Sequence, residues 1–181
     1  MQIKIYSPNG RSTSTWAGGV TTELWLWPED GDYASRNFQA RISSAAVRLE
    51  ESDFTALPGI VRYITPLNGG FTLSHPDGQT ITMAPLDEPY RFDGGTATHC
   101  SGKATDFNLM LKGVGGNMTV MSGQLTVNAG ICCVYPVDGG DVTVNGKALG
   151  LKPGGLAVIH LEKGERVAIE AGRTIVCRIF I

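Results

Sequence analysis

Residues 66–74 read Pro-Leu-Asn-Gly-Gly-Phe-Thr-Leu-Ser, and residues 136–144 read Pro-Val-Asp-Gly-Gly-Asp-Val-Thr-Val, an offset of 70 residues. Each stretch follows an apolar run that contains a tyrosine, and each leads into a second glycine turn, at Asp77-Gly78 and at Asn145-Gly146. Self-similarity at a fixed offset indicates a repeated structural unit. The unit here is strand, Gly-Gly turn, short strand and turn, which predicts two small β-domains fused in one chain.

Composition favours the same fold class. The 181 residues include 24 glycines and 9 prolines, which interrupt the chain too often for long helices, and 42% are hydrophobic, enough for a core. The net charge of −2 offers no electrostatic reason to expect nucleic acid or an anionic membrane as a partner. The chain has no apolar run of about 18 residues and no apolar stretch at its start. We therefore expect a cytoplasmic all-β protein.

Short apolar or alternating runs bounded by Gly, Pro, Asn or Asp predict strands along the whole chain. The predicted strands are 3–6, 21–27, 38–47, 61–67, 71–74, 79–83, 106–111, 118–121, 124–127, 131–135, 141–144, 156–161, 166–169 and 174–181, the last central and well buried. Residues 48–57 could instead hold a helical turn with Ser52 as its N-cap. Residues 112–117 are the most linker-like segment. They predict a first barrel with the N-terminal segment over 1–115 and a second over 116–181, with exchange of strands between the two allowed.

Cysteines and histidines give no sign of a metal or redox site. Cys100, Cys132, Cys133 and Cys177 show no C-x-x-C spacing, and we interpret them as buried small hydrophobic residues. We expect His75 and His99 to be solvated and His160 to be partly buried. No H-x-H pair and no G-x-S-x-G motif occurs. We predict no metal and no cofactor.

Polar residues occupy positions where the strand pattern asks for core. Arg41 and Ser43 alternate with apolar neighbours, Arg62 follows a Pro-Gly turn, and Asp106 and Asn108 share one face of a strand. Guanidinium groups bind carboxylates in bidentate fashion, while amide and hydroxyl groups set the orientation of a ligand. These residues therefore predict a pocket for a carboxylate. The alternative is that Arg41 and Asp106 form an ion pair of purely structural value.

Four motifs resemble the HutD/Ves family. They are Trp16-x-Gly-Gly-x-Thr-Thr-Glu, Gln39-Ala-Arg-Ile-Ser-x-Ala-x-Val47, Phe54-x-x-Leu-Pro-Gly-x-x-Arg62 and Asp106-x-Asn-Leu-Met110, within residues 14–122. The resemblance implies a bicupin with two jelly-roll halves, metal-free and associated with histidine utilisation or stress responses. It also implies that the first barrel is lined by Arg41, Ser43, Arg62, Asp106 and Asn108, with Trp16, Gly18, Gly19, Thr21 and Glu23 near its mouth.

The chain departs from the family pattern at two places. Val61 stands where the family commonly has an acidic residue, and Leu111, Lys112 and Gly113 stand where it tends to have basic residues. A histidine-pathway intermediate therefore does not follow from the resemblance alone.

Three functional hypotheses remain open. The first is a regulatory binding protein for a small anionic metabolite, with Arg41 and Arg62 on the carboxylate. The second is a metal-independent isomerase or hydrolase with Asp106 or Glu23 as general base. It ranks lower, because two nearby arginines are expected to keep Asp106 ionised. The third is an interaction module, in which exposed edge strands would favour a homodimer.

Overall fold

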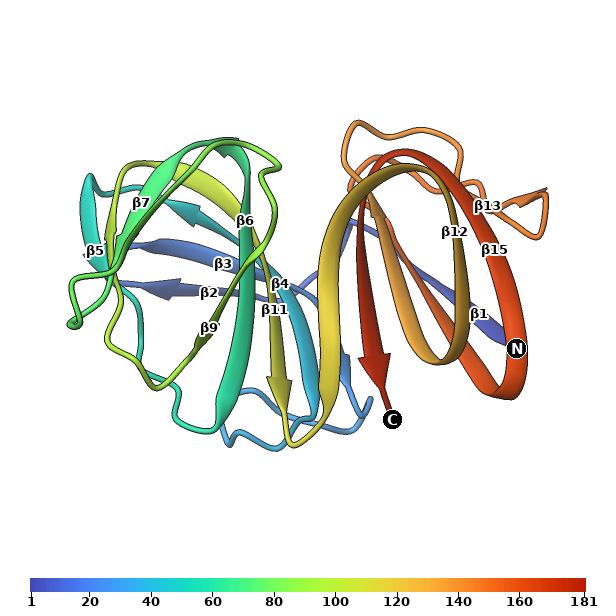
Figure 1. The fold of residues 1–181 in the computed structure, drawn as a ribbon, viewed down its shortest axis with the longest axis horizontal. Coiled ribbons are helices and arrows are strands. Elements are labelled where there is room, and N and C mark those ends of the chain that lie inside the picture. The colour runs from blue at the N-terminus through green and yellow to red at the C-terminus, as the bar shows by residue number, and fades with distance from the viewer. The chain divides into compact units, whose positions relative to one another are not determined.

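The computed structural model describes all 181 residues and confirms the all-β prediction, since it contains strands and no helices (Figure 1). The chain divides into two compact units. The central unit is Ser12–Gly113, and the terminal unit combines Met1–Arg11 with Val114–Ile181. No helix is present that is long and apolar enough to cross a membrane.

The central unit contains two antiparallel sheets. The six-stranded sheet has the order β2-β3-β4-β11-β6-β9 and the four-stranded sheet has the order β5-β10-β7-β8. The bounds are β2 Thr13–Trp16, β3 Gly19–Trp27, β4 Ala40–Val47, β5 Glu51–Asp53, β6 Ile60–Gly69, β7 Phe71–Ser74, β8 Thr80–Met83, β9 Tyr90–Asp93, β10 His99–Ser101 and β11 Ala104–Lys112.

Strand β11 lies between β4 and β6 and is buried along almost its whole length. Phe107 and Leu109, which point to one face, are fully buried. Asp106 and Asn108 point to the opposite face and are also buried. A strand in the middle of a sheet with both faces covered therefore carries polar residues away from water, which makes them candidates for a site.

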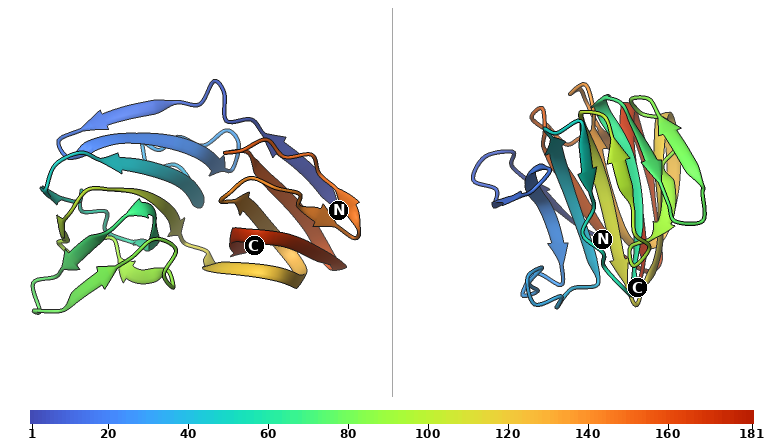
Figure 2. Two further views of the ribbon diagram at one scale, coloured as in Figure 1. Left: turned by 90° about the horizontal axis from the view of Figure 1, so that it is seen from above. Right: turned by 90° about the vertical axis from the view of Figure 1, so that its left-hand side faces the viewer.

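The terminal unit is built around two long strands that bend. Its sheet has the order β1-β15-β13-β14, with β12 also paired to β15. The bounds are β1 Gln2–Tyr6, β12 Gly115–Pro136, β13 Thr143–Val144, β14 Lys147–Ala148 and β15 Leu156–Phe180. Figure 2 shows β12 and β15 as long curved ribbons. Because of the bends, Ile131 lies opposite both His160 and Ile179. Three of the predicted strands merge into the single strand β12, and three more merge into β15.

The structure also corrects one local prediction. Residues 48–57 contain no helical turn, because Glu51–Asp53 form β5 and Ser52 pairs with Cys100 of β10. This pairing joins residues 48 positions apart, and no local pattern encodes it. The four cysteines are buried and free, as predicted.

The N-terminal segment, which the sequence-based division placed with the first barrel, pairs with β15 and groups with the terminal unit. That each unit is a cupin barrel of its own stays a prediction.

Candidate functional site

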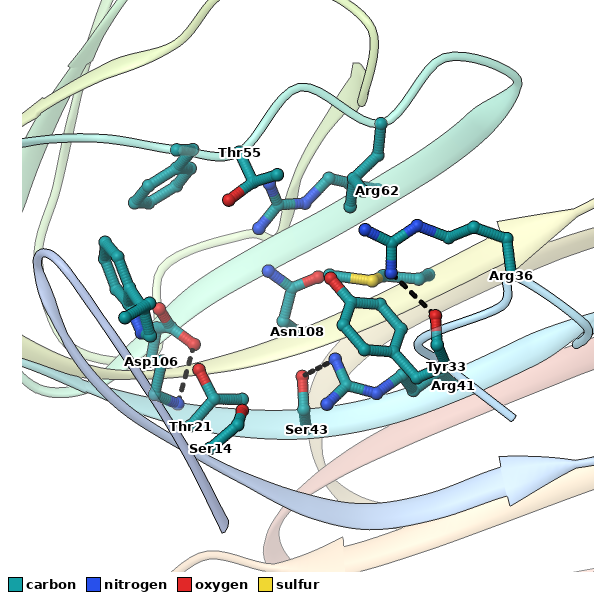
Figure 3. Close-up of a pocket in the computed structure, with 15 residues that line it drawn as sticks. Ser14, Thr21, Tyr33, Arg36, Arg41, Ser43, Thr55, Arg62, Asp106 and Asn108 are labelled. Carbon is teal, nitrogen blue, oxygen red and sulfur yellow. Dashed lines mark hydrogen bonds between the residues drawn. The ribbon is translucent and has the colours of Figure 1, made fainter. Parts of the chain in front are cut away.

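A cavity of about 200 Å³ opens on one face of the six-stranded sheet of the central unit (Figure 3). Strands of this sheet supply its floor, and the segments 33–36 and 54–57 supply further walls. The lining residues are Ser14, Trp16, Thr21, Tyr33, Arg36, Arg41, Ser43, Ala45, Phe54, Thr55, Leu57, Arg62, Asp106, Asn108 and Met110.

Strand register brings the polar residues of this floor together. On β11, Met110 lies opposite Arg41 of β4 on one side and Arg62 of β6 on the other. Two residues away Asn108 lies opposite Ser43 of β4. Side chains two residues apart on a strand point to the same face, so three neighbouring strands present their polar side chains to one space. All five residues expected to line the first barrel border this cavity.

Arg41 is only 3% exposed, and its carboxylate partner is Glu23. The Nε of Arg41 donates to Oε2 of Glu23 at 2.8 Å, and one terminal nitrogen donates to the Ser43 hydroxyl at 3.4 Å. The guanidinium carbon lies 3.8 Å from the centre of the Tyr33 ring, within cation–π range. The alternative prediction of an Arg41–Asp106 ion pair is therefore wrong.

Arg62 is 7% exposed and forms no ion pair and no hydrogen bond within the protein. Its guanidinium carbon lies 5.0 Å and 5.1 Å from the ring centres of Phe54 and Phe92. Burial lowers the pKa of Arg62 to about 10, although the negative charge of Asp106 opposes the shift. The group is still cationic at neutral pH. A buried guanidinium with an unpartnered Nε is prepared for an anion that arrives from outside.

Asp106 is 2% exposed and accepts a hydrogen bond from the backbone nitrogen of Ala45 at 3.2 Å. Burial raises its pKa to about 7, while Arg62 and this hydrogen bond act in the opposite direction. The expectation that two arginines would keep Asp106 ionised is therefore wrong. Arg41 is engaged with Glu23, and loss of hydration outweighs the attraction of Arg62.

Among the lining residues that were not predicted as site residues are Tyr33 and Arg36, which lie in the segment between β3 and β4. Figure 3 shows the Tyr33 ring between the guanidinium groups of Arg36 and Arg41. Arg36 has a φ of 60° and donates to the Tyr33 carbonyl oxygen at 2.7 Å. The backbone nitrogen of Ser35 donates to the Asp32 carboxylate at 2.6 Å. The spacing of Asp32 and Ser35 signals such a turn in sequence, but it does not show where the turn projects.

The residues expected near the mouth divide into three groups. Trp16 and Thr21 border the cavity. Glu23 lines a neighbouring cavity. Gly18 and Gly19 border neither: a side chain on Gly18 would overlap the Trp16 ring, and one on Gly19 would overlap the Ala46 carbonyl group. The structure thus assigns these glycines to close packing.

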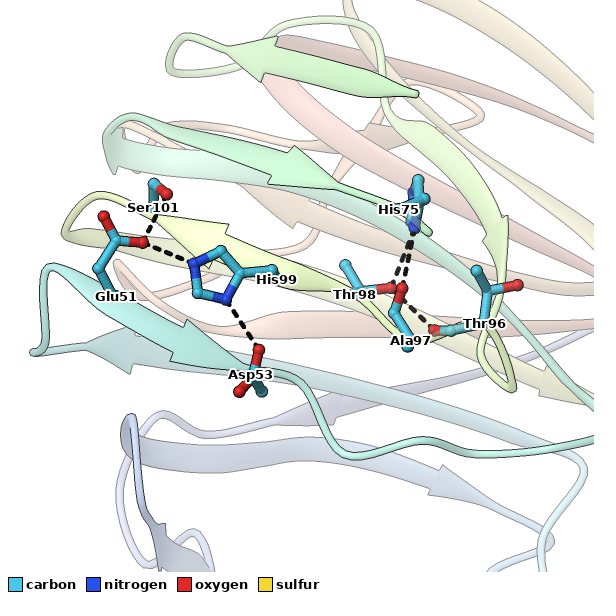
Figure 4. A network of polar contacts seen from close by, with 8 residues as sticks. All are labelled: Glu51, Asp53, His75, Thr96, Ala97, Thr98, His99 and Ser101. Atoms are coloured by element: carbon cyan, nitrogen blue, oxygen red, sulfur yellow. Dashed lines mark hydrogen bonds and ion pairs between the residues drawn. The ribbon is translucent and has the colours of Figure 1, made fainter. Parts of the chain in front are cut away.

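None of the three histidines lines the cavity. Figure 4 shows two of them, His75 and His99, with their polar contacts. His99 is exposed, as predicted, and its two ring nitrogens contact Asp53 at 2.8 Å and Glu51 at 2.7 Å. These hydrogen bonds raise the pKa of His99 above its ordinary value. His75, which we expected in solvent, is buried and contacts the Tyr90 hydroxyl at 3.0 Å. Its turn position in sequence did not reveal that aromatic residues of β9 cover it.

A family model described as HutD matches residues 9–178 of the chain. No curated protein matches the sequence. HutD from Pseudomonas fluorescens SBW25 (formate condition) is similar in structure, with a TM-score of 0.83, 22% identity and 98% of each chain covered. A conserved protein of unknown function from Pseudomonas aeruginosa PAO1 has a TM-score of 0.81 and 21% identity, over 99% of this chain and 98% of that one.

A Cupin 2 conserved barrel domain protein from Leptotrichia buccalis is more distant, with a TM-score of 0.58 and 18% identity, over 100% of this chain and 98% of that one. These likenesses establish a cupin-like β fold.

Proposed function

The chain belongs to the HutD family, and from that premise we propose that it binds a small anionic metabolite in the cavity of its central unit, in a regulatory role. The observation that carries the proposal is Arg62, a buried cation without an ion pair or hydrogen bond in the protein. Leaving such a group unpaired costs free energy, and a carboxylate would supply both the charge and the hydrogen-bond acceptors that it lacks.

The charge balance of the cavity supports an anion as ligand. Arg36, Arg41 and Arg62 border it, against one buried carboxyl group, Asp106, which is partly protonated at neutral pH because burial raises its pKa to about 7. The buried Oδ1 of Asn108 has no hydrogen-bond partner and can accept from an N–H or O–H of the ligand. The cavity therefore offers a cationic end and an orienting amide.

The volume of the cavity and the family of the chain narrow the choice of candidate ligands. The volume of about 200 Å³ lies below the roughly 300–1,000 Å³ of sites for drug-sized ligands, which suits a small metabolite. Intermediates of histidine degradation such as urocanate and formiminoglutamate carry the required carboxylate. They are the first compounds to test, on the strength of the family association.

A thermal-shift titration with small carboxylates, these intermediates and divalent metals tests the proposal. A ligand at a hundredfold excess over its dissociation constant should raise the free energy of unfolding by about 2.7 kcal/mol. Arg62→Met should abolish the shift and leave a folded protein, because the substitution removes a buried charge and breaks no ion pair. Arg91→Met, a change at an exposed arginine of neighbouring β9, should leave the shift intact. An undiminished carboxylate shift in Arg62→Met would overturn the assignment.

A second candidate function is proton-transfer catalysis by Asp106. The observation that favours it is the pKa of about 7, since a general acid or base works best when its pKa lies near the operating pH. If a bound carboxylate is converted, NMR spectra of the mixture will show product, and Asp106→Asn will stop its formation while binding persists. A ligand that stays unchanged over many hours supports the binding protein.

A further inference from the structure

We propose that the ligand is bipolar, with its carboxylate on the arginines and a cationic nitrogen group in a second, acidic cavity beside them. The proposal rests on the proposed function and adds the class of ligand. The second cavity has a volume of about 250 Å³ and lies in the same unit. The two cavities share four lining residues, Ser14, Thr21, Tyr33 and Arg41, so they adjoin along a common wall.

The two cavities carry opposite charge. The first is bordered by three arginines and one buried carboxyl group, Asp106. The second is bordered by two carboxylates, Glu23 and Asp32, and by Arg41 as its sole arginine. Since Arg41 belongs to the common wall, the positive charge concentrates on one side of it and the negative charge on the other. A small molecule with separated charges would match this pattern, and a simple carboxylate would match half of it.

Glu23 is the group that would receive the cationic end. Its side chain is 31% exposed, one oxygen accepts from Arg41 at 2.8 Å, and the other oxygen forms no hydrogen bond in the protein. A carboxylate has acceptor capacity for several donors, so the ion pair with Arg41 leaves room for an ammonium or amidinium group. Asp32 accepts from the Ser35 nitrogen at 2.6 Å and adds negative charge farther out, where the side chains are exposed.

Matched pairs of ligands separate this proposal from the simpler one. Propionate, butyrate and valerate are compared by calorimetry at pH 7 with β-alanine, 4-aminobutyrate and 5-aminovalerate, which differ from them only by a terminal ammonium group. At the chain length that spans the wall, the amino compound should bind about tenfold more tightly. This factor corresponds to one charge-assisted hydrogen bond at a partly exposed site.

The variant Glu23→Gln tests whether the Glu23 charge causes the tighter binding of the amino compound. The amide keeps an oxygen for Arg41 but removes the negative charge, so the amino compound should lose its tenfold advantage while the plain carboxylate binds more tightly than before. Asp32→Asn, whose amide oxygen can still accept from Ser35, should reduce the advantage by a smaller factor. Glu88→Gln, at an exposed carboxylate in the same unit, is the matched control and should change neither ligand.

Two results would overturn the inference and leave carboxylate binding in place. One is an amino group that brings no gain at any chain length, and the other is a gain that survives Glu23→Gln. Failure of every carboxylate to bind would instead remove the proposed function, and the inference with it.

Discussion

Arg62 and Asp106 are buried on adjacent strands, and neither is neutralised by an ion pair. Burial disfavours the charged form of each group. It lowers the pKa of the arginine to about 10 and raises that of the carboxyl group to about 7. Groups with such perturbed protonation gather at binding and catalytic sites. The burial of these two groups costs free energy, and a ligand that pairs with them would recover part of it.

Asp106 makes stability depend on pH in a direction opposite to that of a paired carboxylate. Its pKa in the folded state, about 7, exceeds the ordinary value of 3.8, so the folded protein binds more protons than the unfolded chain between about pH 4 and pH 7. The contribution is therefore fully favourable below pH 4 and is lost as pH rises through this window, by about 4 kcal/mol at most.

Asp106→Asn should abolish this loss, because the amide does not titrate. Urea unfolding at pH 4.5, 6 and 8 should show the variant gaining on the native protein as pH rises, with no further gain above pH 8. A stability difference that is constant across these pH values would contradict the assigned pKa.

At the scale of elements, a bulge in β3 decides which of its side chains share a face of the sheet with Arg41. Glu23 pairs with Ser43, but Trp25 pairs with Ile42, so Leu24 is an extra residue in the strand. In a regular strand, Glu23 and Trp25 are two residues apart and would point to the same face. The bulge therefore directs the carboxylate towards Arg41 and the indole to the opposite face of the sheet.

Close pairing of β3 and β4 depends on Gly19. A Cβ at this position would overlap the Ala46 carbonyl oxygen, which is backbone and cannot rotate away. Gly19→Ala should lower the free energy of unfolding by about 1–3 kcal/mol, as overpacking does elsewhere. The control is Gly172→Ala, where a Cβ would meet open space and the change should stay within about 0.5 kcal/mol. Equal stability of the two variants in chemical denaturation would show that β3 can shift at no cost.

At the scale of the whole molecule, the last long strand of the chain pairs with the first strand. Strand β1 pairs with residues 156–160 of β15, and Ile3 packs against the core of the terminal unit. The segment that precedes the central unit in sequence thus belongs to the other unit. Contacts of such long sequence separation cost loop entropy before they stabilise anything, so we expect β1 to join late in folding.

Ile3→Ala should weaken the terminal unit selectively. Because Ile3 is partly buried, the expected loss is about 1–2 kcal/mol, and hydrogen exchange should accelerate in residues 156–161. Ile5→Ala on the same strand is the control, since Ile5 is 49% exposed and should cost no more than about 0.5 kcal/mol. Faster exchange confined to residues 12–113 would contradict this assignment.

The sequence alone was sufficient for the all-β class, most strands, the buried cysteines and five polar residues of the cavity. These features follow from local patterns: turn residues bound each strand, and a period of two places Arg41 with Ser43 and Asp106 with Asn108. Only the tertiary structure decided that Arg41 pairs with Glu23, that Arg62 has no partner, that Tyr33 closes over the site and that His75 is buried. The physical reason is that register, bulges and loss of hydration depend on strands distant in the chain, whereas strand periodicity is a property of neighbouring residues.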